Sequence, residues 1–516
     1  MSEPFDVAIV GYGPVGQTLA ILLAQRGWRI GVFEKQPAPY PLPRAVHFDH
    51  EVARILQAAG LGEALPRLTE PADVYEWRNA NGETLLRIGS REAGLSGWPE
   101  ANMFSQPELE RALDARARAL SNVAVYRGAE VVDLEAGGEG VEVTVQCDDR
   151  RREVHARAVV GCDGANSFVR GRIGARVTDL GFFFDWLIVD VVPHEPRVWD
   201  PINEQICDPA RPTTVVSGGP GRRRWEFMRL PSEEVADLNN EATAWRLLEP
   251  WRLDRTNATL ERHAVYTFQA RWVDDWRRGR IFLAGDAAHQ MPPFAGQGMC
   301  SGIRDAANLA WKLDLWLRGT ADERLLDTYA SERIPQVRQV IEFSIELGKV
   351  ICVPDRDQAA ARDEAMIART RETGLTPPLP TPAIGPGAVL QGDALAGHLF
   401  LQAEVEADGR RGLFDDVVGR GFALVSCAGD PLSAFDSELA AFFTSIGGIA
   451  AHVGGGVRDV RDRYAQWFRD HRVGVVLSRP DFHVFGTGSA VEDGSRLVRA
   501  LRSTLEGRLE ASTRNH

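Results

Sequence analysis

A glycine-rich turn near the start of the chain constrains its fold more than any other feature. The apolar run Asp6–Val10 is followed at once by Gly11, Gly13 and Gly16 in a G-x-G-x-x-G pattern, and then by apolar residues at helical spacing. The first glycine permits a tight turn, the second lets a pyrophosphate approach the backbone, and the third lets helix and strand pack closely. A second apolar strand ends in Glu34, 18 residues after Gly16.

This strand–turn–helix–strand unit predicts a dinucleotide site. The helix N-terminus offers N–H groups to phosphates, and a carboxylate at Glu34 accepts hydrogen bonds from ribose hydroxyls. Because the same carboxylate would repel a 2′-phosphate, the expected ligand is FAD or NAD. The alternative is a plain glycine-rich turn beside a surface glutamate, which the order of the elements disfavours.

Two later segments favour FAD. Gly161–Arg170 (GCDGANSFVR) closes one apolar strand, and Arg280–Met299 (RIFLAGDAAHQMPPFAGQGM) closes another and leads into a helix. A strand that ends in Gly-Asp places a carboxylate at the carboxyl edge of the sheet, where ligands collect. A glycine-rich loop before a helix supplies N–H donors for an anionic ring edge, such as that of a reduced flavin. Asp163 and Asp286 could alternatively be helix caps.

Composition excludes several classes of protein. The 516 residues suggest roughly three domains, and a formal net charge of −13 argues against a nucleic-acid binder. No apolar stretch reaches the ~18 residues that a membrane span needs, and the first residues do not resemble a secretion signal. Six scattered cysteines without a Cys-x-x-Cys pair favour reduced thiols. We therefore expect a cytoplasmic protein with no membrane contact and no metal site.

The rest of the chain divides by pattern. Residues 181–277 are rich in Trp, Phe and Val and predict a mostly β insertion. Helical spacing returns after Gly302, and a further helix is expected over residues 321–350 with an interruption at Pro335. The proline-rich stretch 376–382 predicts a connector to a C-terminal unit.

In order and spacing, the three glycine-containing segments resemble those of the group A flavoprotein aromatic hydroxylases. Gly296–Lys312 (GQGMCSGIRDAANLAWK) and Pro43–His47 (PRAVH) are most similar to the 3-(3-hydroxyphenyl)propionate hydroxylase branch. That branch includes relatives that act on resorcinol-like phenols and on polyketides. The resemblance covers residues 5–350 well and the C-terminal unit more loosely.

The resemblance implies an α/β fold: a Rossmann-like FAD-binding domain with an inserted β-sheet substrate domain, and a thioredoxin-like C-terminal α/β domain. The implied boundaries are 1–73, 102–180 and 278–365 for the FAD-binding domain, 74–101 and 181–277 for the substrate domain, 366–384 for a linker, and 385–516 for the thioredoxin-like domain. Without a Cys-x-x-Cys pair, that last domain is not expected to perform thiol redox chemistry. Packing, or contact between two copies in a homodimer, is its expected role.

The resemblance also implies the cofactor contacts. They are Gly11, Gly13, Pro14, Val15, Gly16, Glu34, Lys35, Arg44, Gln106, Val131, Asp163, Gly164, Gly285, Asp286, Pro293, Gly296, Gln297, Gly298 and Met299. Asp163 and Gly164 match a motif linked to both FAD and NAD(P)H, and Gly298 and Met299 would present N–H groups to the pyrimidine edge of the flavin. Arg44 could instead be a surface arginine.

The implied reaction is hydroxylation of a small aromatic or polycyclic phenol. NADH or NADPH would reduce FAD, dioxygen would add to the flavin, and the resulting hydroperoxide would transfer its terminal oxygen to an electron-rich ring. Two other reactions stay open: a Baeyer–Villiger-type insertion beside a ketone, and a flavin oxidoreductase on a polyketide that never activates dioxygen. A scaffold that keeps the dinucleotide fold without catalysis is a third reading.

The reacting groups are less constrained than the cofactor site. The candidate catalytic residues are His47, Pro292 and Pro293, and the candidate substrate contacts are Tyr266 and Phe294. Related phenol hydroxylases carry an aspartate where this chain has Val46, so His47, with an ordinary pKa near 6.5, is the candidate base. A lone histidine can equally be structural. The run Arg222–Arg224 is expected to be a solvated hairpin tip.

Overall fold

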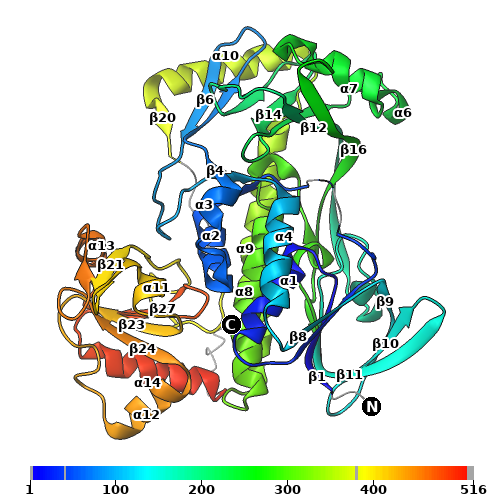
Figure 1. Cartoon of the computed structure of the whole chain (residues 1–516). Coiled ribbons are helices and arrows are strands. Elements are labelled where there is room, and N and C mark those ends of the chain that lie inside the picture. The colour runs from blue at the N-terminus through cyan, green and yellow to red at the C-terminus, as the bar shows by residue number, and fades with distance from the viewer. Residues whose placement is uncertain (1–3, 40–41, 43, 378–381, 508–516) are drawn as a thin grey trace, which may run out of the picture.

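The computed structural model describes residues 4–39, 42, 44–377 and 382–507. The chain forms three parts, each built on a sheet of its own. In Figure 1 the N-terminal part lies at the lower right, a β-rich part at the top and the C-terminal part at the lower left. Two long helices, α8 (Gly298–Leu317) and α9 (Arg324–Ile351), run through the middle of the molecule.

The N-terminal part contains an eight-stranded sheet in the order β17-β18-β11-β1-β2-β8, extended by β10 and β9. Its elements are β1 (Phe5–Val10), α1 (Pro14–Ala24), β2 (Ile30–Glu34), α4 (Gln106–Arg118), β8 (Val123–Arg127), β9 (Ala129–Ala136), β10 (Val141–Cys147), β11 (Arg150–Gly161), α5 (Phe168–Arg172), β17 (Arg277–Arg278) and β18 (Ile281–Leu283). β1 is parallel to both β2 and β11. Its residues are almost all buried, which explains the unbroken apolar run in the sequence.

Shorter elements bridge this sheet to the rest of the molecule. They are β3 (His47–Phe48), α2 (His50–Leu56), the π-helix η1 (Gln57–Leu61), α3 (Leu65–Leu68), β4 (Thr69–Pro71), β7 (Asn102–Phe104) and the 3-10 turns η3 (Gly285–Ala287) and η4 (Pro293–Ala295). β3, β7 and β4 form a small separate sheet.

The β-rich part is a nine-stranded sheet in the order β19-β16-β12-β15-β14-β13-β5-β6-β20. Its elements are β5 (Val74–Arg78), β6 (Thr84–Gly89), β12 (Val177–Pro193), β13 (Asn203–Ile206), β14 (Thr213–Ser217), β15 (Arg223–Met228), α6 (Val235–Leu238), α7 (Glu241–Leu248), η2 (Glu249–Trp251), β16 (Ala258–Val273), β19 (His289–Gln290), α10 (Arg356–Thr373) and β20 (Leu375–Thr376). Leu187 and Val189 pack with residues of α6 and α7 on one face. Trp186 and Ile188 pack in a different cluster, on the opposite face, which we call the inner face.

The C-terminal part has a four-stranded sheet, β24-β23-β26-β27, and a smaller sheet, β22-β21-β25. Its elements are β21 (Glu404–Ala407), β22 (Arg410–Leu413), α11 (Phe414–Val417), β23 (Phe422–Ser426), α12 (Ser437–Ser445), β24 (Gly448–His452), β25 (Arg458–Asp459), α13 (Arg463–His471), β26 (Val475–Ser478), β27 (Val484–Gly488) and α14 (Asp493–Leu505). Trp311 and Leu315 of α8 share an apolar core with Phe422 and Leu477. The C-terminal part therefore docks on α8.

The predicted interruption at Pro335 is wrong, because α9 is a single helix. A proline removes one N–H donor from a helix and crowds the preceding turn. Here a distant segment crosses that point, and the Gly385 N–H donates to the Glu332 carbonyl at 2.8 Å. The loss of one donor does not break the helix here, and a distant segment of the same chain packs against that turn and donates to the next carbonyl.

The predicted solvated tip at Arg222–Arg224 is wrong for two of its three residues. Arg223 and Arg224 begin β15 and are 2% and 3% exposed. Arg224 is tolerated because Asp190, on the neighbouring strand β12, accepts two hydrogen bonds from its guanidinium, at 2.7 and 3.1 Å. The sequence of one strand cannot show that a charged residue has an oppositely charged partner on the neighbouring strand.

Part of the predicted linker has regular structure. Residues 366–373 are the last turns of α10, and Leu375–Thr376 pairs with β6 as the edge of the nine-stranded sheet. Residues 378–381 lie outside the described residues. The domain boundaries proposed from the sequence remain a prediction.

Candidate active site

The three glycine-containing segments meet at one edge of the first sheet. A Cβ added to Gly11 would lie 2.4 Å from the Cys162 carbonyl oxygen, so the first turn touches the segment after β11. Val15 in turn contacts the segment after β18, because a Cβ on Gly285 would lie 3.1 Å from Val15 Cγ2. Arg170 donates a hydrogen bond to the Ala287 carbonyl at 3.1 Å. Three stretches of chain far apart in sequence therefore line one site.

The first turn has the geometry that a pyrophosphate needs. Gly11 has φ +99°, and a Cβ on Gly16 would lie 2.3 Å from the Gly11 carbonyl oxygen, so neither position tolerates a side chain. No atom of the described residues lies within 4 Å of a Cβ built on Gly13, which leaves space above that residue. α1 begins at Pro14 without a side-chain cap, so its first N–H groups can bind phosphate.

Glu34 lies beside this turn. Its Oε2 accepts a hydrogen bond from the Tyr12 N–H at 2.9 Å, and its Oε1 accepts one from the Gln36 N–H at 2.8 Å. Arg127 is the register partner of Glu34 on β8, and its guanidinium lies 5.1 Å from the centre of the Tyr12 ring. Arg127 is not among the predicted site residues. Its place at the end of β8, the strand beside β2, is the sequence feature that could have indicated it. Lys35 is exposed.

The segment that carries Arg44 is held by hydrogen bonds to its backbone from α4 and from the β-rich part. Gln106, which is buried, accepts a hydrogen bond from the Ala45 N–H at 2.7 Å, and its amide donates to Glu110 at 2.7 Å. Arg44 is exposed, and its carbonyl accepts a hydrogen bond from Arg224 of the β-rich part. Of the quoted PRAVH stretch, Pro43 lies outside the described residues.

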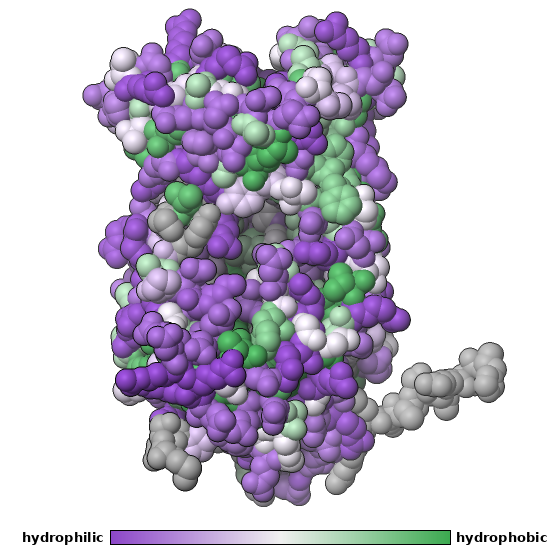
Figure 2. Space-filling model, turned by 90° about the vertical axis from the view of Figure 1, so that its right-hand side faces the viewer, coloured by the Kyte–Doolittle hydropathy of each residue, from purple (hydrophilic) through white to green (hydrophobic). Residues whose placement is uncertain are grey.

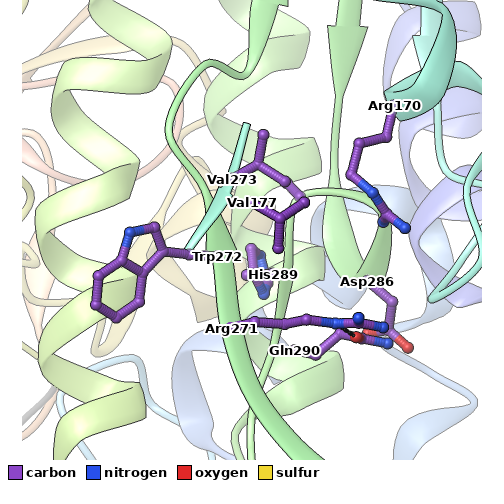
Figure 3. Close-up of a pocket in the computed structure, with 9 residues that line it drawn as sticks. Arg170, Val177, Arg271, Trp272, Val273, Asp286, His289 and Gln290 are labelled. Atoms are coloured by element: carbon purple, nitrogen blue, oxygen red, sulfur yellow. Dashed lines mark hydrogen bonds between the residues drawn. The ribbon is translucent and has the colours of Figure 1, made fainter. Parts of the chain in front are cut away.

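The two predicted aspartates differ. Asp163 accepts hydrogen bonds from the Ser167 hydroxyl at 2.6 Å and the Val169 N–H at 3.1 Å, so it also anchors the start of α5. Gly164 follows it with φ +78°. Asp286 is exposed and lines a pocket with Arg170 and other residues, and Figure 3 shows its carboxylate beside the ends of the Arg271 and Gln290 side chains.

Asp305 fixes the turn that carries Asp286, although the sequence analysis did not single it out. One carboxylate oxygen accepts hydrogen bonds from the Gly285 N–H at 3.0 Å and His289 Nε2 at 2.7 Å. The other accepts one from Arg333 at 2.8 Å. Burial would raise the pKa of Asp305, but His289 and Arg333 hold it below the ordinary value. A charged residue on the buried face of α8 was the available signal.

The proline loop leads directly into α8. Pro292 is extended and Pro293 begins the 3-10 turn, which ends at Gly296 with φ +64°. A Cβ on Gly296 would lie 2.9 Å from His47 Nδ1, so the His47 ring lies against this loop. α8 starts at Gly298 without a side-chain cap, and the N–H groups of its first turn, which include Met299, can face a negative group.

A buried ion cluster, here called the loop cluster, consists of Asp49, Glu51, Gln297 and Arg304. Arg304 donates to Glu51 at 2.6 Å, to Asp49 at 2.5 Å and to Gln297 at 2.8 Å, and the Gln297 amide donates to Asp49 at 3.1 Å. Burial alone would raise the pKa of Asp49, but the Arg304 guanidinium holds it well below its usual range. The cluster ties the proline loop to the start of α2.

His47 lies between this cluster and the loop. Burial lowers the pKa of His47, and the nearby Asp49 carboxylate offsets only part of that effect. The imidazole is therefore neutral at neutral pH and able to accept a proton. The Cys300 thiol donates a weak hydrogen bond to the His47 carbonyl at 3.8 Å.

Aromatic side chains of the inner face close the site above the loop. The Phe294 ring centre lies 5.6 Å from that of Trp186 and 6.2 Å from that of Phe268. Tyr266 is the cross-strand partner of Trp186 and belongs to the same cluster. Val131, by contrast, is a buried residue of β9 paired with Val145, so only its backbone could contact a cofactor.

A second buried ion cluster, the junction cluster, consists of Lys312, Glu332, Arg479 and Asp481. Glu332 accepts hydrogen bonds from Lys312 at 2.7 Å and from Arg479 at 2.8 and 3.0 Å. Asn308 joins it by donating to Glu332 at 2.8 Å and to Asp481 at 3.0 Å. Arg479 and Lys312 hold the pKa of Glu332 at about 2, although burial alone would raise it. This cluster joins α8 and α9 to the C-terminal part.

Five of the six free cysteines have poorly ionised thiols. Burial raises the pKa of Cys207 to about 12 and that of Cys427 to about 11. Burial also raises the pKa of Cys162, Cys300 and Cys352 above the ordinary value. Cys162 and Cys300 belong to the segments that form the site.

This geometry defines a flavoprotein fold, and the comparisons with known proteins agree. The family model described as FAD binding domain matches residues 4–344, and the one described as HcaD C-terminal domain matches residues 397–504. The chain therefore belongs to the FAD binding domain family, within its group A aromatic hydroxylases, and its cofactor is FAD.

Two relatives share most of its length. A protein of Rhodococcus jostii (strain RHA1), named as a probable NADH-specific resorcinol 4-hydroxylase, is 38% identical and matches over 96% of this chain and 94% of its own. A 3-(3-hydroxy-phenyl)propionate/3-hydroxycinnamic acid hydroxylase of Mycobacterium sp. (strain JLS) is 35% identical, over 93% and 89%.

Solved structures show the same fold. The flavin-dependent monooxygenase PieE, in complex with FAD and substrate, superposes with a TM-score of 0.81 at 23% identity, covering 98% of this chain and 99% of PieE. Aklavinone-11 hydroxylase, with FAD and aklavinone, gives 0.80 at 23% identity, covering 98% of this chain and 100% of that chain. The predicted fold class, enzyme class and FAD cofactor are confirmed. Within the described part of the chain, no helix combines the length and apolarity of a membrane span.

Proposed function

We propose that this protein hydroxylates a phenolic aromatic compound, with NADH or NADPH as reductant and dioxygen as oxidant. The observation that carries this proposal is the meeting of three FAD-type segments beneath the aromatic inner face, where Phe294 packs on Trp186. The names of the two relatives, a resorcinol hydroxylase and a hydroxyphenylpropionate hydroxylase, support the same reaction class.

The cofactor and the chain divide the work. Bound FAD supplies hydride acceptance from NAD(P)H and transfer of one oxygen atom of dioxygen to the ring, the other leaving as water. The turn at Gly11–Gly16 and Glu34 would hold its ADP half. The first N–H groups of α8, at Gly298 and Met299, would stabilise negative charge on the pyrimidine edge of its ring.

His47 and the aromatic wall would act on the substrate. A phenolate ring is more electron-rich than a phenol, so removal of the hydroxyl proton favours attack on oxygen. His47, neutral because burial lowers its pKa, would accept that proton at an imidazole nitrogen. Phe294 and Trp186 would exclude water, while Pro292 and Pro293 stiffen the loop beneath them.

The direct test follows NADH and NADPH oxidation by the FAD-loaded protein across a panel of phenols, with hydrogen peroxide measured in parallel. Substrate-stimulated oxidation, coupled to a product that carries one atom of labelled dioxygen, is the expected result. An unlabelled product would indicate a flavin oxidoreductase that does not activate dioxygen, and oxygen inserted into a ring would indicate a Baeyer–Villiger-type reaction. Failure to bind FAD would contradict the proposal altogether.

We also propose that the chain forms a homodimer. Leu180 and Phe183, near the start of β12, are exposed apolar side chains, and such residues often mark protein interfaces. A molar mass of one chain by light scattering at micromolar concentration would contradict this assembly.

A further inference from the structure

The inner face of the nine-stranded sheet carries charged residues as well as aromatic ones. Cross-strand pairs lie on the same face, so Asp190, opposite Arg224 on β15 and Arg262 on β16, shares the face of Trp186 and Ile188. This face is directed towards the FAD-binding part, because Arg224 donates a hydrogen bond to the Arg44 carbonyl there. Figure 2 shows a hollow in the middle of the molecule on one side, between the upper and lower parts.

Glu226 lies in the middle of this face. It is the cross-strand partner of Ile188, and on β15 it stands between Arg224, which contacts the Arg44 segment, and Met228, which belongs to the cluster around Phe294. It therefore lies between the two ends of the candidate substrate site.

The charges of the inner face cancel. Arg224 makes a paired hydrogen bond with Asp190, and Arg262 lies 3.7 Å from the same carboxylate. Glu226, the second carboxylate of this group, lies 3.7 Å from Arg224. Among the described residues of this face, two guanidinium groups are thus matched by two carboxylates, without an excess cation for an anionic ligand.

Glu226 differs from Asp190 in having no direct hydrogen bond. It is 9% exposed, and among the described residues no donor is recorded within hydrogen-bond distance of its carboxylate. Burial raises the pKa of Glu226, and Arg224 offsets only part of that effect. A largely buried carboxylate without a protein donor can accept a hydrogen bond from a hydroxyl group that enters the site.

We propose that Glu226 is a specificity residue that accepts a hydrogen bond from a second ring hydroxyl, and that this site selects uncharged polyhydroxybenzenes over phenols that bear a carboxylate. This inference rests on the proposed function. It also distinguishes between the two relatives, because one is named for a dihydroxybenzene and the other for a carboxylate-bearing phenol.

Two physical effects favour a polyhydroxybenzene over a phenol that bears a carboxylate. A site built to hydrogen-bond a substrate hydroxyl disfavours an analogue that lacks this hydroxyl. A substrate carboxylate would enter a face that has no excess positive charge and would lie near the Glu226 and Asp190 carboxylates, where like charges repel.

The test compares three ligands: resorcinol with two hydroxyls, phenol with one, and 3-(3-hydroxyphenyl)propionate with one hydroxyl and a carboxylate. Binding to the FAD-loaded protein is followed by the flavin absorbance, and turnover by coupled NADH oxidation. We expect kcat/KM for resorcinol to exceed that for the carboxylate-bearing phenol by about 100-fold or more.

Glu226→Gln, which keeps the shape of the side chain, should weaken resorcinol binding by about 10-fold or more and change phenol binding by less than about 3-fold. Glu261→Gln, at an exposed position of β16, is the matched control and should change neither.

Two results would overturn the inference: efficient use of the carboxylate-bearing phenol by the unmodified protein, or equal losses for resorcinol and phenol in Glu226→Gln. Binding is measured separately from turnover. A protein that binds resorcinol in a Glu226-dependent way but oxidises no phenol would therefore support the specificity role and contradict only the proposed reaction.

Discussion

The loop cluster and the junction cluster are built from the same kinds of side chain and lie along one helix, yet they differ in charge balance. Arg304, Asn308 and Lys312 are spaced four residues apart on α8 and face the two clusters in turn. The junction cluster contains two cations and two carboxylates. The loop cluster contains one cation, Arg304, and two carboxylates.

The difference teaches how buried charge is used in this fold. In the junction cluster, hydrogen bonds within the cluster match its charges, so we infer that it serves the assembly of two parts of the chain. The loop cluster keeps an excess of negative charge, and Glu51 Oε1 has no hydrogen-bond partner in the part of the chain that the structure describes. That charge lies beside His47 and the loop before α8, so we infer that it serves the site.

The largest effect is expected at the junction. Glu332→Ala leaves Lys312 buried without its carboxylate partner and Arg479 with Asp481 alone, and it should lower the free energy of unfolding by about 3–5 kcal/mol. Urea unfolding measures the change. Glu346→Ala, an exposed position on the same helix, should change it by less than about 0.5 kcal/mol. A loss below about 1 kcal/mol for Glu332→Ala would contradict the assembly role.

Removal of Arg304, the cation of the loop cluster, should mainly lower the affinity for FAD. Arg304→Met removes one of the two hydrogen bonds that hold the Gln297 side chain beside the proline loop, and it should weaken FAD binding by about 10- to 100-fold. Fluorescence of released FAD gives the dissociation constant. Arg318→Met, at the half-exposed residue that follows the last residue of the same helix, is the control. If Glu332→Gln weakened FAD binding as much as Arg304→Met, the division of roles between the clusters would be wrong.

The pH dependence of turnover should change with the charge of the loop cluster and not with that of the junction cluster. Because burial lowers the pKa of His47, kcat/KM should be flat at neutral pH and fall as His47 is protonated below pH 6.5. The Asp49 carboxylate raises that pKa, so Asp49→Asn should move the fall to lower pH by about 1 pH unit. His47→Gln should abolish it, and Glu332→Gln should leave it in place. An unchanged profile in His47→Gln would exclude the histidine as the base.

The smallest effect concerns the link between the clusters. His483 Nε2 lies 3.8 Å from Glu51 Oε1, too far for a hydrogen bond. A double-mutant cycle of His483→Gln and Glu51→Gln should therefore give a coupling energy below about 1 kcal/mol in urea unfolding. A coupling above about 2 kcal/mol would show that the two clusters form one network.

Much of the fold and of the cofactor turn is predictable from the sequence. The glycine pattern reflects steric limits, of which the contact of Gly16 with Gly11 is local, whereas the contact of Gly11 with Cys162 joins distant parts of the chain. The apolar strand runs and the helix after Gly302 also follow from local pattern, although α8 begins earlier, at Gly298.

The partners of buried charges could not be predicted in this way. Arg304 lies in a helix whose sequence is consistent with a plain amphipathic surface, and its partner Asp49 is 255 residues away. Arg224 looked like part of a surface run because Asp190 compensates it across strands. Pro335 looked like a break for a similar reason, because the segment around Gly385 that packs against this turn comes from beyond the proline-rich stretch.

The poorly ionised cysteines bear on the durability of such an enzyme. A monooxygenase that consumes NADH without hydroxylating its substrate releases hydrogen peroxide next to its own thiols, and peroxide attacks thiolates far faster than thiols. Cys162 and Cys300 lie in the segments closest to that source, and the raised pKa of each keeps it protonated. NADH oxidation without hydroxylation should therefore leave these sulfur atoms unoxidised, so that the peroxide it releases does not inactivate the enzyme through them.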